Sequence, residues 1–551
     1  MHIPIKSLLI GMLACSAMVA CTNEDLPEVD NGNEQQSGEQ AFIAVNIVNS
    51  NTTSRGISNS FENGTAEENA FDKATFFFYD ASGNPYNVSG TNNFVEKEYK
   101  DVTITPSTGN VEEEVGPVLV IEESQNVPPQ KLLVVLNAPS GLNGLTLEKV
   151  REQVGSYGLT VSTDAEPKVT YTSGSKFVIS NSVYKNETTG SMVDAVDLTA
   201  ANIAPDAKTA NDNPVNVYVE RTVAKVKVTD KRTETKVGVT VKDESNQNVE
   251  IHAQIVGWKV TNITNKTNLL KKIDPKWDNT ALGLTWNDAP NFRSYWADTE
   301  DKPVVHPWNY NELTNAKGTF DYYFENTKAN VNEVTEGDVV TTPARHNKSQ
   351  LLVAVKLAAS ADATTGVTIC EWFGTKYTLS GLQTAIANSL NTQIYYKADK
   401  SSIKPEDITF YQESDDETIV KEKRYLSYAI LDNEDNTLTD ETFMDANGAA
   451  LTLAQVNEKL AAVHPALIWN GGMSYYFIDI EHFGTGETAY GLVRNHLYDI
   501  TIGKIEGLGT PVYDPTKIIT PEKPVEEFSF ISAKINILAW KLVKQEDVTL
   551  K

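Results

Sequence analysis

Residues 131–137 read Lys-Leu-Leu-Val-Val-Leu-Asn, a continuous apolar run typical of a strand that is buried on both faces. Short runs of the same kind, rich in β-branched and aromatic residues, recur along the chain. They are Thr75–Tyr79, Val215–Val228, Ala253–Thr261, Tyr322–Glu325, Leu351–Leu357, Ser474–Ile480 and Leu497–Ile502. Helical patterns are too few to cover a parallel sheet. The sequence therefore predicts an all-β protein with few short helices, built from two β-sandwiches.

Three stretches have helical signals. Two begin with apparent capping boxes, Ser380 with Gln383 before Leu382–Leu390, and Thr452 with Gln455 before Leu453–Val463. The third is Thr146–Val154. The charged stretch Thr229–Asn248 is the predicted joint, which gives an N-terminal sandwich over residues 56–240 and a C-terminal sandwich over 241–506.

The composition excludes some classes of protein. The chain has 551 residues, a formal charge of −27 and 40% apolar residues, enough for packed cores. Because phosphate binding needs clustered positive charge and no basic stripe is present, nucleic acid is excluded as a partner. Of the three cysteines, only Cys370 would remain as a free thiol after processing and lipidation of the leader, so no internal disulfide is expected. We predict that Cys370 is buried in a strand over Val367–Trp372.

The first 20 residues have the pattern of a signal peptide. Lys6 precedes an apolar run, Ser7–Ala20, that is too short to span a bilayer as a helix. The run ends at Cys21 in a context similar to a lipobox, and polar residues follow. Cleavage at Cys15 instead would leave an apolar start to the mature chain. The sequence therefore predicts a bacterial lipoprotein with lipid attached at Cys21.

An acidic spacer follows, and residues 21–55 are predicted to be a tether with one strand. That strand, Phe42–Val48, is very apolar through Phe42, Ile43, Val45 and Ile47. The polar loop after it contains Arg55, the only arginine in the first 150 positions, followed by Gly56. An isolated arginine on exposed backbone could be a protease site, although the residues alone favour an ordinary loop arginine.

The C-terminal tail, residues 507–551, has two parts. Residues 507–528 contain Pro511, Pro515, Pro521 and Pro524, which excludes a helix or a central strand. Fully extended, this part would reach roughly 70 Å. An alternating strand follows, with Ile531, Ala533, Ile535, Ile537 and Ala539 on one face. We interpret the tail as a strand held away from its own domain by a stiff linker.

No catalytic constellation is evident. The chain has no nucleophile elbow, zinc motif or phosphate-binding glycine loop, so we predict no enzyme activity, no catalytic residue, no cofactor and no metal site. Three histidines, His306, His464 and His496, lie beside apolar or turn residues and are interpreted as structural. Tyrosines and tryptophans could stack on sugars, but core and interface roles are more common for them.

Several short motifs together resemble the fimbrillin family of type V pilus subunits. They are Lys131–Pro139, Val219–Val226, Gly257–Asn262, Arg293–Trp296, Tyr323–Thr327, Arg494–Tyr498 and Gly507–Val512. The length and C-terminal region are most similar to the major shaft subunit of the short, minor-type fimbria. Tyr323 and Phe324 depart from the pattern, since relatives are expected to have a cysteine there.

The resemblance implies two transthyretin-like sandwiches, export as an outer-membrane lipoprotein through Cys21, and cleavage by an Arg-specific protease between Arg55 and Gly56. Cleavage would remove the strand of Phe42, Ile43, Val45 and Ile47. The strand Ile531–Val543 would then be donated to the next subunit of an adhesive surface fimbrium. The implied partners are other copies of the chain, anchor and tip subunits, the protease and, before maturation, the outer membrane.

Two alternatives stay open. The chain could be a fimbrial anchor or tip, although anchors should lack the arginine site and tips the free C-terminal strand. It could also be a surface lipoprotein that binds glycans, which would require exposed aromatic residues clustered on one face.

Overall fold

The computed structural model describes part of the chain. The described residues belong to one unit, Gln40–Lys551. They are residues 40–50, 64–99, 111–115, 118–122, 127–186, 189–273, 287–288, 293–294, 297–299, 301–316, 318–328, 331–332, 335–336, 339–340, 345–412, 425–434, 437–440, 442–482, 490–521, 530–538 and 542–544.

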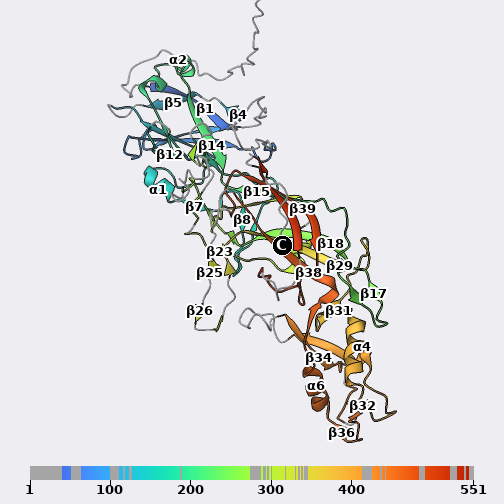
Figure 1. Cartoon of the computed structure of the whole chain (residues 1–551). Helices are drawn as coiled ribbons and strands as arrows, with labels where there is room; N and C mark the ends of the chain where they lie inside the picture. Colours follow the sequence, from blue (N-terminus) through green and yellow to red (C-terminus); the bar gives the residue numbers. More distant parts are fainter. Residues whose placement is uncertain are drawn as a thin grey trace, which may run out of the picture. The chain divides into compact units, whose positions relative to one another are not determined.

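The first sheet is formed by strands from the N-terminal half of the chain (Figure 1). Its order is β3 (Phe94–Glu98), β2 (Lys73–Tyr79), β6 (Lys131–Leu136), β10 (Ile179–Asn181), β14 (Val215–Arg221), β1 (Gln40–Ser50) and β4 (Val111–Val115), with β5 (Val118–Glu122) on β1 and β13 (Val196–Asp197) on β6. The apolar run at residues 131–137 thus forms β6. It is buried on both faces, because Leu132 and Val134 enter the main core while Leu133 and Val135 pack in a second cluster with Leu147.

A β-sandwich follows. One sheet is β24 (Phe320–Tyr323), β15 (Ala224–Asp230), β39 (Leu497–Glu506), β41 (Phe530–Leu538) and β42 (Leu542–Lys544). The other is β18 (His252–Thr261), β29 (Gln350–Ala358), β38 (Met473–Asp479) and β40 (Thr510–Pro511). Val226 and Ile500, in the sheet of β15 and β39, share a core with Val353 and Ile478, in the sheet of β29 and β38. The mainly β architecture with few short helices confirms the predicted fold class.

β15 pairs with β24 and β39 in a sheet of this sandwich, although the predicted N-terminal sandwich, residues 56–240, includes its residues. The break at Thr222 and Val223, inside the run Val215–Val228, separates β14 from β15 and passes the chain from one sheet to the next. The domain limits at residues 240 and 506 otherwise stay a prediction.

Between β29 and β38 the chain builds a module that was not anticipated, residues 366–472, here called the insert. Its strands form a sheet with two strands from further upstream. The order is β17 (Asn248–Val249), β16 (Val241–Lys242), β31 (Thr375–Thr378), β30 (Ile369–Trp372), β37 (Ala466–Trp469), β34 (Leu426–Leu431) and β33 (Ile408–Gln412). A second small sheet is β32 (Tyr395–Tyr396), β35 (Phe443–Met444) and β36 (Ala450–Leu451).

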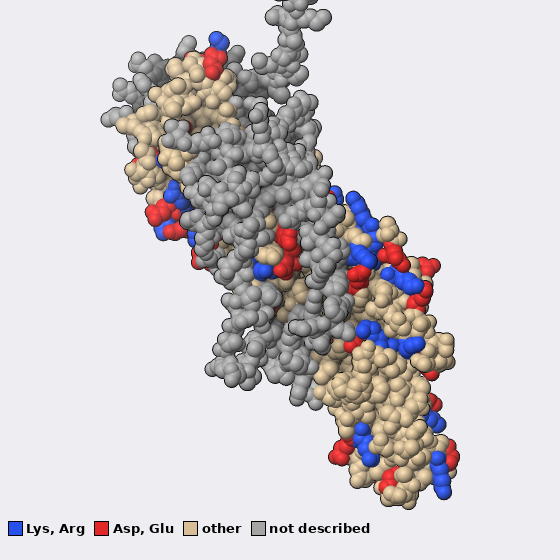
Figure 2. Space-filling model, viewed as in Figure 1, with Lys and Arg blue, Asp and Glu red and all other residues tan. Residues whose placement is uncertain are grey.

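The insert has a core of its own. Cys370 lies in it, fully buried in β30 as predicted, and burial raises the pKa of its thiol. Leu382 and Ile386 of α4 (Leu379–Leu390) and Val456 and Leu460 of α6 (Leu453–Ala461) complete it. In the view of Figure 2, the surface in the region of α4, α6 and β34 is mostly uncharged, with charged side chains at its borders.

The helix signals are mostly confirmed. Thr452 and Gln455 form the predicted capping box at α6, and Thr146 caps α1 (Leu147–Arg151). The prediction of Ser380 as a cap is wrong. Because β31 runs directly into α4, the cap is Thr378, whose side chain accepts a hydrogen bond from the Gly381 amide.

The remaining elements are short. The helices are α2 (Ala207–Asn211), α3 (Tyr310–Thr314), η1 (Ala200–Asn202), η5 (Pro405–Asp407) and η6 (Asn470–Gly472). The two-stranded pairs are β7 (Val154–Gly155) with β20 (Thr267–Asn268), β8 (Thr160–Val161) with β9 (Val169–Thr170), β11 (Tyr184–Lys185) with β12 (Met192–Val193), β19 (Ile263–Thr264) with β23 (Val304–Val305), β21 (Asn287–Asp288) with β22 (Arg293–Ser294), β25 (Val331–Asn332) with β28 (Arg345–His346) and β26 (Thr335–Glu336) with β27 (Val339–Val340). Among the described residues, no helix combines the length and apolar character needed to cross a bilayer.

Candidate strand-exchange site

The strand predicted to be removed by cleavage, β1, lies inside the first sheet. It pairs in parallel with β14, where Val45 faces Val215 and Ile47 faces Val217. On its other side it pairs antiparallel with β5 and β4. Ile43 and Val45 are fully buried, and Phe42 is partly buried and exchanges two backbone hydrogen bonds with Ala204. Loss of β1 would therefore leave unpaired backbone on both sides and an apolar groove.

Three predicted processing positions lie outside the described residues, namely Cys21, Arg55 and Gly56. The described chain resumes at Gly64. Soon after, Glu68 is almost fully buried and forms an ion pair with Lys225 of β15, with 2.7 Å between Oε1 and Nζ. The segment that would form the new N-terminal region is therefore anchored independently of β1.

The predicted donor strand is β41, and its backbone pairs antiparallel with β39 of its own chain, from Leu497 opposite Leu538 to Glu506 opposite Phe530. β42 adds a further strand to this edge, while Ala539 lies outside the described residues. The expectation that this strand stays away from its own domain is thus wrong for the isolated chain.

The prediction of a free linker over residues 507–528 is also wrong for residues 507–521. β40 pairs with β38, the Ile519 amide donates a hydrogen bond to the Trp308 carbonyl (2.8 Å), and Leu508, Val512 and Ile519 are buried. The prolines exclude a helix and a central strand, but they do not prevent docking. The described part of this connection, residues 507–521, docks on the opposite sheet through β40 and on the segment before α3 through Ile519.

Gly509 makes this docking possible. Its φ is +70°, and a Cβ atom there would lie 2.5 Å from Ser474 Oγ and 2.8 Å from the Tyr475 carbonyl oxygen. Any larger residue would push the segment off β38. Two tyrosine hydroxyls also hold the docked segment in place. Tyr475 donates to the Thr520 carbonyl (3.0 Å), and Tyr513 donates to the Phe410 carbonyl of the insert (2.8 Å).

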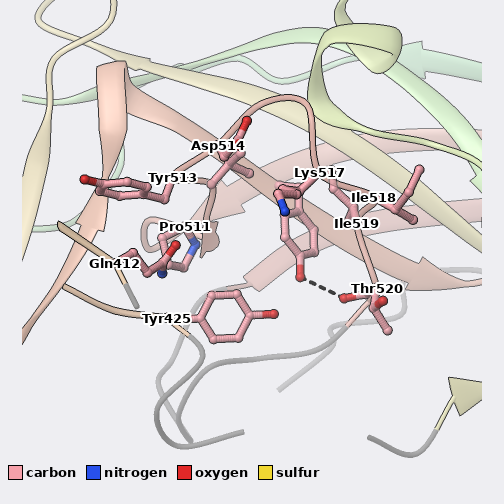
Figure 3. A pocket seen from close by; sticks show the side chains of 11 residues that line it. Gln412, Tyr425, Pro511, Tyr513, Asp514, Lys517, Ile518, Ile519 and Thr520 are labelled. Atoms are coloured by element: carbon pink, nitrogen blue, oxygen red, sulfur yellow. Dashed lines mark hydrogen bonds between the residues drawn. The ribbon is translucent and has the colours of Figure 1, made fainter. Parts of the chain in front are cut away.

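The docked segment forms one wall of a narrow groove (Figure 3). Gln412 and Tyr425 of the insert line the opposite wall, and Ile518 is 42% exposed at its margin. The cavity volume of about 60 Å³ leaves room for only a few water molecules. The groove is therefore a packing seam and not a ligand site.

Three of the motifs that resemble fimbrillins converge at one buried network, here called the junction. Arg494 is fully buried, and its Nη2 lies 2.7 Å from Oε2 of the buried Glu325. The same guanidinium donates to the carbonyl oxygens of Asn268 (2.7 Å) and Leu269 (3.1 Å). The third of these motifs, Val219–Val226, contributes Glu220 to the network.

A second ion pair adjoins this one. Lys271 Nζ lies 3.0 Å from Glu220 Oε2 and donates to the Ser294 carbonyl (2.6 Å). Burial raises the pKa of Glu220 and lowers that of Lys271. Since β14 carries Glu220 while Arg494 leads into β39, these contacts connect the first sheet with the sandwich.

Arg221 forms the other half of the junction. Its Nε donates to the Glu68 carbonyl (3.0 Å) and its Nη1 to Asn495 Oδ1 (3.2 Å). Burial raises the pKa of Glu68, but the charge and hydrogen bond of Lys225, with hydrogen bonds from Tyr322 and Thr65, outweigh burial and lower it. Each of these buried charges has a partner of opposite sign or a carbonyl acceptor, although Glu220 Oε1 and Arg494 Nε have no hydrogen-bond partner among the described residues. Buried charges with fixed partners favour one arrangement of the elements that they join.

The three histidines differ. His306 and His496 are buried, as expected for structural residues, and His496 Nδ1 lies 2.7 Å from the Arg494 carbonyl oxygen. His464 is exposed and packs against Phe373. No cluster of potential metal ligands occurs among the described residues.

The comparisons with known proteins point to one family. The family model described as "Major fimbrial subunit protein type IV, Fimbrillin, C-terminal" matches residues 468–546. No curated protein matches the chain.

Three solved structures of fimbrial proteins are similar to the chain. A fimbrilin from Porphyromonas gingivalis W83 has 10% identity and a TM-score of 0.34, with 93% of this chain and 99% of that chain covered. The tip fimbrial protein Mfa3 from P. gingivalis, with a C-terminal truncation, has 11% identity and a TM-score of 0.28, covering 90% and 99%. A fimbrial assembly protein from Parabacteroides distasonis has 13% identity and a TM-score of 0.28, covering 61% and 84%.

These structural likenesses are too distant to assign the role of any residue. The family match covers β38, β39 and β41, the strands around the candidate exchange edge. On this match, residues 468–546 are similar to the C-terminal region of fimbrillins.

Proposed function

We propose that the chain is a shaft subunit of an adhesive surface fimbrium that polymerises by donating its C-terminal strand to the next subunit. The observation that supports this most directly is the position of β1, bonded on both sides within a sheet and preceding Arg55 by only a few residues. Removal of such a strand creates a vacancy that only another strand can fill.

The expected energy favours exchange. A strand that buries four or five apolar side chains at about 1.5–3 kcal/mol each gains roughly 6–15 kcal/mol before ordering costs. β1 itself buries Ala41, Ile43, Ala44 and Val45. A contact of that size, repeated head to tail without rotational closure, forms a filament. β41 is the proposed donor, and in the isolated chain it pairs at the sheet edge of β39.

The proposed route begins with export as an outer-membrane lipoprotein through Cys21. Cleavage after Arg55 by an Arg-specific protease then frees the chain from its lipid and from β1 together. Before cleavage, β1 occupies the groove and blocks assembly. The proposed partners are further copies of the chain and the anchor and tip subunits of the fimbrium.

Arg55→Ala tests the gate. We expect the variant to stay a folded monomer that melts at least as high as the processed protein, because β1 remains between β14 and β5. Electron microscopy and size-exclusion chromatography would measure this. Arg151→Ala is a matched control, since Arg151 is a half-exposed surface arginine paired with Asp194 and should not affect filaments. Normal filaments from Arg55→Ala would contradict the proposal.

Cys21→Ala tests the lipid anchor. Metabolic labelling with a fatty-acid analogue should mark the wild-type chain and not the variant. Cys15→Ala is the control and should retain the label. Equal labelling of wild type and Cys21→Ala would exclude lipidation at this position.

The alternative assignments to a fimbrial tip or anchor predict different behaviour. A tip subunit would not need to donate β41, and an anchor would not need cleavage at Arg55. If Arg55→Ala reduced the length of the filaments but not their number, the shaft assignment would be favoured.

A further inference from the structure

The hairpin turn between β30 and β31 has an unusual residue in a strained position. Trp372 pairs with Thr375, so Phe373 and Gly374 form a two-residue turn, and their φ angles are +48° and +74°. Two successive positive φ angles are typical of a type I′ turn, where asparagine, aspartate or glycine is favoured first. A bulky residue with positive φ is an outlier. Phenylalanine is therefore an unfavourable choice for folding at this position.

The Phe373 side chain does not recover this cost by burial. It is 66% exposed. Two neighbouring rings hold it in place, with centroids 4.8 Å away for Trp372 and 4.4 Å away for His464. We call these three side chains the aromatic platform.

The surroundings keep the platform rigid. Trp372 Nε1 donates to the His464 carbonyl (2.7 Å), which fixes the indole against the loop before β37. Across the stem of the hairpin, Glu371 and Lys376 form an ion pair of 2.9 Å. A site that is preorganised loses little conformational entropy when a ligand binds.

His464 adds a polar group. Its Nδ1 lies 2.7 Å from the Pro465 carbonyl oxygen, which can only accept, so Nδ1 carries the proton. In the neutral ring, Nε2 is then an acceptor, and among the described residues no hydrogen bond engages it. An exposed ring therefore lies next to an available hydrogen-bond acceptor.

We propose that the aromatic platform binds a neutral pyranose sugar of a glycan. The axial C–H groups of a pyranose carry a partial positive charge and the face of an aromatic ring a partial negative one, so the two attract, and a sugar hydroxyl can donate to Nε2. One strongly exposed ring, flanked by Trp372 of the hairpin and by His464 of the loop before β37, matches the size of one sugar ring. The platform is too small for a stable protein interface, which needs about 800 Å² on each partner.

This inference does not depend on assembly by strand exchange. Strain at an exposed residue supports a functional role because such strain persists where it serves one. The inference assigns a ligand class to the insert, while the proposed polymerisation uses β1 and β41.

The test uses the purified full chain. Labelled protein would be applied to an array of neutral glycans, and hits would be confirmed by saturation-transfer NMR with the free sugars. Phe373→Asn is the informative variant, because asparagine suits the turn. We expect it to melt at the same temperature as the wild type or higher, and to bind about tenfold more weakly or worse.

Two controls define the outcome. His464→Phe keeps a ring but removes Nε2, so binding should weaken by only about threefold. Tyr411→Ala removes an exposed aromatic side chain elsewhere on the insert and should bind as the wild type does. The proposal is overturned if the wild type retains no neutral glycan or if Phe373→Asn binds equally well. Loss of filaments in Phe373→Asn without any glycan binding would also overturn it, in favour of a protein contact.

Discussion

Arg494→Met is expected to lower the free energy of unfolding by about 3–5 kcal/mol. The substitution removes the positive charge at the junction and leaves the Glu325 carboxylate buried without its ion-pair partner. It also removes the donors to the carbonyl oxygens of Asn268 and Leu269. Chemical denaturation followed by circular dichroism would measure the loss.

Arg151→Met is the matched control. Arg151 is also paired with a carboxylate, that of Asp194, but its side chain is half exposed. Because solvent screens such pairs, its removal should cost less than about 1 kcal/mol. Equal losses in the two variants would show that the junction contributes no more than a surface ion pair.

The residues of the junction were visible in the sequence, but their association was not. Glu220 and Arg221 follow an apolar alternation, and Arg494 precedes one, so the sequence showed charged residues at the ends of predicted strands. What joins them is the packing of segments more than 200 positions apart, as between Arg221 and Asn495. Local periodicity contains no information about such pairs.

Single strands were the most predictable feature. β6, β29 and β38 each have a long apolar or alternating run, and the structure places all three in sheets. The insert was missed because its sheet joins segments far apart in the sequence: β30 pairs with β37, Ile369 opposite Trp469, and β16 extends the sheet by pairing with β31. β16 is only two residues long and lies within the charged stretch that we interpreted as a joint.

The tail shows how a local rule can be correct and its interpretation wrong. Prolines do prevent residues 507–521 from forming a helix or central strand. The same segment also contains the apolar residues Leu508, Val512 and Ile519, which are buried in the structure. Their burial shortens the free reach of β41, since the chain is held up to Thr520 by its bond with Tyr475.

Two truncations separate the docked segment from the strand that we propose is donated. A chain that ends at Pro521 keeps Leu508, Val512 and Ile519 in place. It should stay folded, because β39 still pairs with β15, and it should form no filaments after cleavage at Arg55. A chain that ends at Glu506 loses all three buried side chains. At about 1.5–3 kcal/mol each, its free energy of unfolding should fall by roughly 5–9 kcal/mol.

The pair of truncations also tests whether β41 acts between subunits. Thermal melts and electron microscopy would be compared for both chains and the full-length protein. If β41 belonged structurally to its own domain, ending the chain at Pro521 would unfold the sandwich as severely as ending it at Glu506. If another segment filled the groove left by β1, the chain ending at Pro521 would still polymerise. Donation of β41 requires that the chain ending at Pro521 be a folded monomer and that the chain ending at Glu506 be destabilised. The first chain has lost the donor strand, so it should not assemble, but it keeps the docked segment and its core.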